Sequence, residues 1–220
     1  MRTIRVTGKG QIRLRPDLTR ITMILDGLWP QYGDAVKHSS EDTEALKEVL
    51  ESFGFARRDL KTLSFHVEPE YEGYQEENVY KQRLAGYRFR HELKLEFDSY
   101  NERLGKIVYA LANDCGGTPE LRISYTVRDP EAAKKTLLAK AVQDSREKAE
   151  LLVQAAGSAL GELQTIDYSW GQIDLEVRPM NRLQSKMMCA RGESSDSYTM
   201  DIEPDDIEVS DSVTVVWEIA

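Results

Sequence analysis

The order of its segments constrains the fold of this chain more than any single motif does. A first strand-like stretch, VTGKGQIRLRPD (residues 6–17), runs into Pro16-Asp17. A long amphipathic helix, a tyrosine-rich extended region and an alanine-rich helix follow in that order. This order points to a fold and a family but not to a reaction, because no nucleophile, base and orienting group stand at a recognisable spacing.

The length and composition indicate a folded protein with a substantial core. A chain of 220 residues can form one large domain or two small lobes. Its 40% hydrophobic and 30% charged residues, with a mean hydropathy of -0.51, are typical of soluble globular proteins. We therefore expect residues 1–220 to form a single structural unit, as one body or two lobes, with a mobile surface excursion at about 173–204, where no hydrophobic period is visible.

The charge balance argues against nucleic acid as a partner. The chain has 29 basic and 38 acidic residues, a net charge of -9, which repels phosphate backbones. Acidic residues are interleaved with the basic run Lys81, Arg83, Arg88, Arg90 and Lys94, which predicts a mixed-charge sheet surface.

The start of the chain predicts a location. Neither a signal-peptide core nor an apolar run of about 18 residues is present, so no membrane span is expected. We expect a cytoplasmic protein from the sequence as given, or an exported one if it is a trimmed mature form.

Sulfur-containing side chains are the most specific candidates for a metal site in this sequence. Cys115 and Cys189 are the two cysteines; reduced thiols are the default, and a single bridge between them stays open. Soft ligands of the kind Cu(I) requires gather in the excursion, where Met187, Met188 and Cys189 are the candidate ligands. The competing interpretation is that these residues only fill gaps against the body or a partner.

The first two strand-like stretches, about residues 4–14 and 18–25, are predicted to form a β-hairpin around Pro16-Asp17. Gly8 and Gly10 lie inside the first of them, where glycine marks a bulge or a close backbone approach. A dinucleotide fingerprint is rejected, because a third glycine and a directly following helix are missing.

Two long strands within residues 63–97 are predicted to flank a flexible tip. Four tyrosines in this region have two interpretations, an aromatic ligand platform or cross-strand packing: Tyr71, Tyr74, Tyr80 and Tyr87. His66 and His91 fall on neighbouring strands and could meet across the sheet; the favoured alternative is that each is a hydrogen-bonded or exposed strand histidine. His38 lies on a helix, where we expect a solvent-facing or capping residue. None of the three histidines has the spacing of a zinc site.

Periodicity predicts the remaining elements. A helix is expected from Asp34 to about Phe53, with Gly54 ending it. A second is expected from about Tyr100 to Ala112, with the apolar stripe Leu104, Ile107, Val108 and Leu111 in the core. A third is expected from Pro130 to about Ala156, with Asp129 as its cap and Gly157 ending it. Strands are expected at about 121–127, 163–170 and 207–219.

The whole chain resembles the SIMPL family, a group of bacterial and animal proteins. The matching stretches include VTGKGQIRLRPD, GFARRDLKTLSFHVEPEY, LAGYRFRHELKLEF, the alanine- and lysine-rich helix that follows YTVRDP, and IEVSDSVTVVWEI. The resemblance implies an α+β fold in which antiparallel sheets are backed by helices. Some relatives form large ring- or channel-like oligomers, and others are associated with oxidative-stress defence. No catalytic residue set is established for the family, so the resemblance implies no catalytic residues in this chain.

We expect from these features a non-enzymatic, self-associating protein with stress-protective or scaffolding use, without a cofactor, working as a homo-oligomer or with a protein partner. The alternative is a small-ligand or soft-metal binding protein that uses the tyrosines or the Met187, Met188 and Cys189 cluster. An unrecognised enzyme is the third alternative, and no residue supports it.

Overall fold

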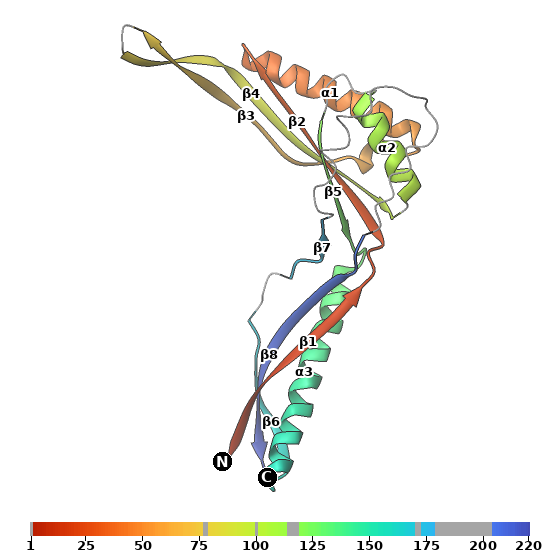
Figure 1. Cartoon of the computed structure of the whole chain (residues 1–220), viewed down its shortest axis with the longest axis vertical. Coiled ribbons are helices and arrows are strands. Elements are labelled where there is room, and N and C mark those ends of the chain that lie inside the picture. The colour runs from red at the N-terminus through yellow and green to blue at the C-terminus, as the bar shows by residue number, and fades with distance from the viewer. Residues whose placement is uncertain (1, 77–78, 100, 114–118, 170–172, 179–203) are drawn as a thin grey trace. The chain divides into compact units, whose positions relative to one another are not determined.

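A computed structural model of the chain describes residues 2–76, 79–99, 101–113, 119–169, 173–178 and 204–220 (Figure 1). The chain divides into two compact units. Unit 1 comprises Met1–Asp17, Thr126–Val177 and Pro204–Ala220, and unit 2 comprises Leu18–Tyr125 and Arg178–Glu203. Each unit combines an antiparallel sheet with helices, so the predicted α+β fold is confirmed.

Unit 1 is a small sheet backed by one long helix. Its strands lie in the order β1 (Thr3–Leu14), β8 (Ile207–Ile219), β6 (Leu160–Asp167), and all neighbours are antiparallel. Helix α3 (Pro130–Ala155) covers the sheet, and the two-residue strand β7 (Glu176–Val177) follows later in the chain. Two clusters of buried side chains fill the space between helix and sheet, around Val215 and Leu137.

Local sequence explains where α3 begins and ends. The Asp129 carboxylate accepts a hydrogen bond of 2.9 Å from the Ala132 N–H, and Pro130 occupies the first turn, where its missing N–H costs nothing. Gly157, with φ 72°, follows the helix in the left-handed conformation that glycine tolerates. The expected Asp129 cap and the glycine stop are therefore confirmed.

The predicted β-hairpin between the first two strands is wrong. Both strands exist, but β1 pairs with β8 along its whole length, and β2 (Leu18–Trp29) pairs with β4 (Val79–Asp98) in unit 2. The connection is extended, since Pro16 disfavours helical or tight-turn geometry in the residue before it. Asp17 is then held by Thr126 and Arg128: its N–H donates to the Thr126 carbonyl, and its carboxylate accepts from the Arg128 N–H at 2.7 Å.

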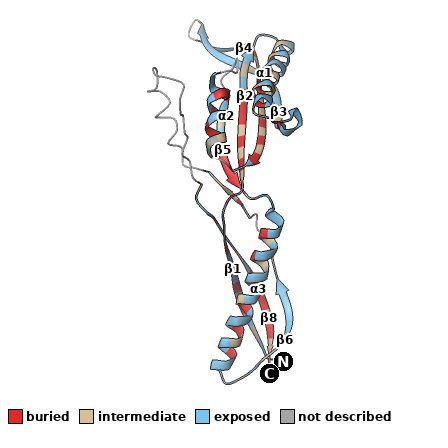
Figure 2. Cartoon of the chain, turned by 90° about the vertical axis from the view of Figure 1, so that its right-hand side faces the viewer, coloured by how far each residue is buried: buried red, intermediate tan, exposed pale blue. Residues whose placement is uncertain are grey.

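Unit 2 is a larger sheet with its helices on one face. Within it the strand order is β3 (Lys61–Glu76), β4, β2, β5 (Glu120–Thr126). Helices α1 (Tyr32–Ser52) and α2 (Asn101–Asn113) and the short 3-10 helix η1 (Arg57–Asp59) complete the unit. Figure 2 shows buried residues on the strands beneath these helices. Alternate strand residues and one stripe of each helix form this core, which includes Ile21, Met23, Leu46, Leu93, Leu104 and Tyr125.

The helices of unit 2 match the predicted ranges within one or two residues. Gly54, with φ 82°, ends α1, as its position after the last apolar turn predicted. The predicted core residues Leu104, Ile107 and Leu111 of α2 are buried. Among the described helices of the chain, none combines the length and the apolar character needed to cross a membrane.

Candidate functional site: strand edges and the β3–β4 hairpin

Helix α3 approaches β1 so closely that only glycine fits between them. A Cβ atom on Gly10 would lie 2.1 Å from the carbonyl oxygen of Leu137, and Gly8 is equally crowded. The β1–β8 register runs without a shift through both glycines, so neither is a bulge. Of the two interpretations of the Gly-x-Gly sequence, close backbone approach is confirmed.

The same helix closes the free edge of β1 with hydrogen bonds from its side chains. Lys148 Nζ donates to the Thr7 carbonyl at 3.5 Å, and Lys140 Nζ donates to the Gln11 carbonyl at 3.4 Å. Between them the Lys9 N–H donates to the Asp144 carboxylate at 2.6 Å. The hydrogen bond from Lys148, and then that from Lys9, lowers the pKa of Asp144. These groups occupy positions that an added strand would need.

In unit 2 the β3–β4 hairpin continues beyond its sheet as a two-stranded ribbon (Figure 1). Strand β2 ends at Trp29, opposite Tyr87, because Pro30 follows and turns the chain into α1. Residues 79–86 of β4 therefore pair with β3 alone in the described part of the chain. A two-stranded ribbon is marginally stable in water, so this one gains from any surface that covers it.

Large apolar side chains are exposed along the ribbon, and we call them the hairpin patch. Its members and their exposed fractions are Tyr71 60%, Tyr74 37%, Val79 55%, Tyr80 73% and Leu84 45%. Tyr80 lies over Gly73, where a Cβ would meet its hydroxyl oxygen at 1.8 Å. Tyr74 lies under the guanidinium of Arg83, 5.6 Å from its carbon to the ring centre. Cross-strand contacts thus hold two tyrosines in place without burying them.

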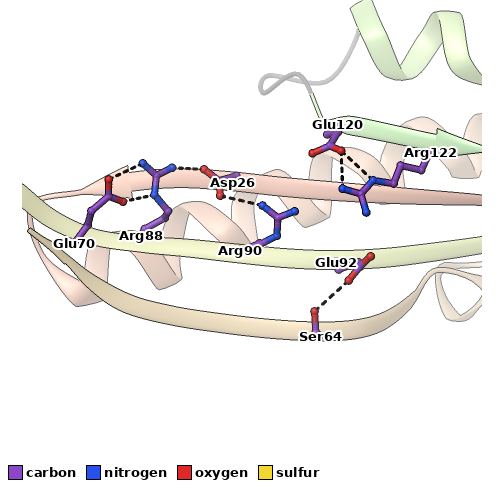
Figure 3. A network of polar contacts seen from close by, with 8 residues as sticks. All are labelled: Asp26, Ser64, Glu70, Arg88, Arg90, Glu92, Glu120 and Arg122. Atoms are coloured by element: carbon purple, nitrogen blue, oxygen red, sulfur yellow. Dashed lines mark hydrogen bonds and ion pairs between the residues drawn. The ribbon is translucent and has the colours of Figure 1, made fainter. Parts of the chain in front are cut away.

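The sheet face of unit 2 opposite the helices carries a network of ion pairs (Figure 3). Arg88 lies at its centre: its guanidinium pairs with Asp26 on β2 and with both oxygens of Glu70 on β3, one at 3.0 Å. Arg90 reaches the same Asp26 at 3.8 Å. The hydrogen bond from Arg88 lowers the pKa of Glu70, and those carboxylates raise the pKa of Arg88. The predicted mixed-charge surface is confirmed, and its charges are mutually compensated.

The two strand histidines face opposite sides of the sheet and do not meet, because β3 pairs His66 with Arg90 and Phe65 with His91. His91 lies beneath α1, where the Thr43 hydroxyl is 3.2 Å from Nδ1 and the Thr62 hydroxyl is 2.9 Å from Nε2. Burial, and then the nearby charge of Lys47, lowers the pKa of His91. This arrangement fits a neutral structural imidazole that links a helix to the sheet.

His38 is half-buried at the start of unit 2's long helix, and it is neither a cap nor a free surface residue. Its ring stacks on Trp29 with centres 3.6 Å apart and planes 8° from parallel. Its Nδ1 lies 3.1 Å from a carboxylate oxygen of Glu41. The stack fastens the end of β2 to α1.

The soft-metal candidates Met187, Met188 and Cys189, together with Cys115, lie outside the described residues. Within the residues that are described, no group of three or more His, Cys, Asp or Glu side chains is placed to hold a metal ion. Val79 and Leu84 could not be identified as surface residues from the sequence, because an apolar residue on a predicted strand does not show whether a neighbouring element covers it.

Comparison with known proteins agrees with the fold and the motifs. The model of the SIMPL family, described as a protein of unknown function (DUF541), matches residues 4–217. No curated protein matches the chain. Because the match covers both units and almost every described element, the chain belongs to the SIMPL family.

Proposed function

We propose that this protein is a non-enzymatic, self-associating protein that uses the β3–β4 hairpin as its contact element. The observation that carries the proposal is the hairpin patch, a set of exposed apolar side chains on a two-stranded ribbon. The register places Tyr71, Tyr80 and Leu84 on one face of the ribbon and Tyr74 and Val79 on the other, so both faces carry exposed apolar groups. Exposed apolar groups gathered on one element are typical of protein contacts. Covering them with another copy removes apolar surface from water and supports the ribbon.

The shifted titratable groups favour contact over catalysis. Glu70 and Arg88 are mutually paired, Asp144 is tied to Lys148 and Lys9, and His91 is held by hydroxyl groups. The pKa shifts have structural causes: pairing between strands for Glu70 and Arg88, a hydrogen bond from Lys148 of the same helix for Asp144, and burial for His91. Catalytic groups need in addition a reactive partner aimed at a substrate position. Stress protection or scaffolding is the use of such an assembly that the family resemblance implies.

Light scattering coupled to size-exclusion chromatography tests this proposal. The wild-type protein is expected to elute with a mass above the 25.1 kDa of one chain. The variant Tyr71→Ser/Tyr80→Ser/Leu84→Ser is expected to shift toward the single-chain mass, because it removes apolar surface without touching the core. Tyr109→Ser is the matched control, since Tyr109 is an exposed tyrosine on α2. A wild type that stays at 25.1 kDa over the micromolar range contradicts the proposal.

A further inference from the structure

We propose that strand β6 of one copy adds to the free edge of β4, at residues 79–86, of a second copy. This inference rests on the proposed function and specifies the partner surface and the kind of contact. It follows from which strand edges of the fold are closed, which are open, and what charges they carry.

Unit 1 has one closed edge and one open edge. The edge of β1 is occupied by Lys140, Asp144 and Lys148 of α3. The opposite edge belongs to β6, the last strand in the order β1-β8-β6, and its backbone has no comparable side-chain cover in the described part of the chain. Any strand that joins this sheet must therefore join at β6.

Strand β6 also exposes apolar side chains on the face that should be covered. Leu163 and Ile166 lie opposite Trp217 and Val215, which are both buried beneath α3. Yet Leu163 is 46% and Ile166 47% exposed, and Figure 2 shows β6 exposed beside the helix. These side chains are exposed because α3 is too narrow to cover all three strands. A helix about 10 Å across covers roughly two strands spaced about 4.8 Å apart, and α3 packs mainly on β1 and β8.

In unit 2 the open edge lies where β2 stops. Trp29 is the last residue of β2 and pairs with Tyr87, so the edge of β4 beyond it, at residues 79–86, continues with no partner on that side in the described residues. A strand added there would continue the line of β2. It would also cover part of the hairpin patch, which includes Tyr80 and Leu84.

Charge complementarity selects the pairing between these two edges. Residues 160–167 of β6 read LGELQTID, with two acidic residues and no basic one, and residues 79–86 of β4 read VYKQRLAG, with two basic residues and no acidic one. Within the chain Arg83 pairs with Glu72, and Asp167 pairs with Arg5 at 3.6 Å; both are exposed ion pairs, which contribute little. Pairing either segment with its own copy would bring segments of like charge together, whereas pairing β6 with β4 brings segments of opposite charge together. The other edge of the ribbon, β3, fits less well because it contains Pro69 and is acidic at Glu68, Glu70 and Glu72.

The resulting contact is heterologous: it uses two different surfaces, so every copy can donate β6 to one neighbour and accept β6 from another. Main-chain hydrogen bonds would supply affinity, and the alternating side chains would supply specificity, as in other cases of strand addition. Copies joined in this way form a closed ring or an open chain, according to the rotation at each contact.

Complementary variants test the contact. The β6 variant carries Leu163→Asp and Ile166→Asp, and the hairpin variant carries Tyr80→Asp and Leu84→Asp; all four side chains are exposed, so both variants should fold, which circular dichroism checks. Each variant alone is expected to be a monomer or nearly so. Mixed in equal amounts they should form a dimer and nothing larger in native mass spectrometry, because the mixture has one intact pair of surfaces. Leu151→Asp, at an exposed leucine of α3, is the matched control and should assemble as the wild type does.

Charge reversal gives an independent reading of the same contact. Lys81→Glu and Glu162→Lys should each weaken assembly by about tenfold in dissociation constant, and the two together should restore most of the loss. If the β6 variant assembles as the wild type does while the hairpin variant does not, this contact is wrong and the proposed function survives. If the wild type itself never assembles, the proposed function fails along with the contact.

Discussion

A methyl group placed on Gly8 would lie 2.0 Å from the carbonyl oxygen of Ala141, so strand β1 and helix α3 touch backbone to backbone. The helix contributes small residues to this seam, among them Ala133, Ala141, Ser145 and Ala149, all buried. The close approach brings the α3 side chains Lys140, Asp144 and Lys148 within reach of the β1 backbone. A packing feature of the core thus decides which strand edge of unit 1 stays open.

Substitution Gly8→Ala is expected to destabilise the protein by about 1 to 3 kcal/mol, because the strand and helix must move apart to admit the side chain. Urea unfolding followed by circular dichroism measures the change. Gly33→Ala is the matched control: nothing lies within 4 Å of its added Cβ in α1, and alanine suits a helix better than glycine. Equal stability of Gly8→Ala and the wild type would contradict the close approach of β1 to α3 at this residue.

Removing the Asp144 carboxylate should open the edge of β1 without unfolding unit 1. We expect several-fold faster hydrogen exchange at the Lys9 amide in Asp144→Ala, since that N–H loses its 2.6 Å acceptor. Exchange in the core of β8 should change little. Glu147→Ala is the control, because Glu147 accepts only from Gln143 on the helix surface in the described structure. Unchanged exchange at Lys9 would rule out the protective role of Asp144.

Stability should fall as the pH drops from about 7.5 to about 5.5, and His91 should contribute to the fall. The folded state lowers the pKa of His91, so the unfolded chain takes up a proton first as the pH passes below the usual histidine value of about 6.5. The stability contribution is therefore complete above that value and is lost below it. Urea unfolding at both pH values should show a smaller difference for His91→Gln than for the wild type. An equal difference in His91→Gln and the wild type would contradict this role of His91.

The ion-pair network predicts the titration of Glu70. Arg88 lowers the pKa of Glu70, so Arg88→Met should raise it back toward the usual glutamate range, as NMR titration of the carboxyl carbon would record. The stability supplied by this pair is present above the unfolded glutamate pKa and is lost as the pH falls through the folded one. Arg122→Met should leave Glu70 unaffected, because Arg122 pairs with Glu120 on β5. A Glu70 pKa that is the same in the wild type and in Arg88→Met would contradict the network.

Much of the fold could be predicted from the sequence, because periodicity and end signals act locally. Asp129 and Pro130 marked the start of α3, Gly54 the end of α1, and alternation marked the long strands. The pairing of β1 with β8 could not be predicted in this way, because partners more than 190 residues apart leave no local signal. The predicted β1–β2 hairpin was wrong for that reason: alternation identifies strands but does not show which strands pair with each other.

The candidate contact surfaces were less predictable than the elements that carry them. Leu84, Leu163 and Ile166 look like core residues in the sequence, and they are exposed because β2 ends at Trp29 and α3 is only wide enough for two strands. The sequence left open whether His91 contacts His66, forms other hydrogen bonds or is exposed, and only the register shows that it lies beneath Thr43. Burial depends on what lies above a strand, and that follows from tertiary packing.

Sedimentation equilibrium of the wild-type protein, over a concentration range from below to well above one micromolar, tests most directly whether this chain works by joining copies of itself. We predict a weight-average mass that rises with concentration above the 25.1 kDa of one chain. A mass of 25.1 kDa at every concentration would contradict self-association and with it the proposed role of the hairpin.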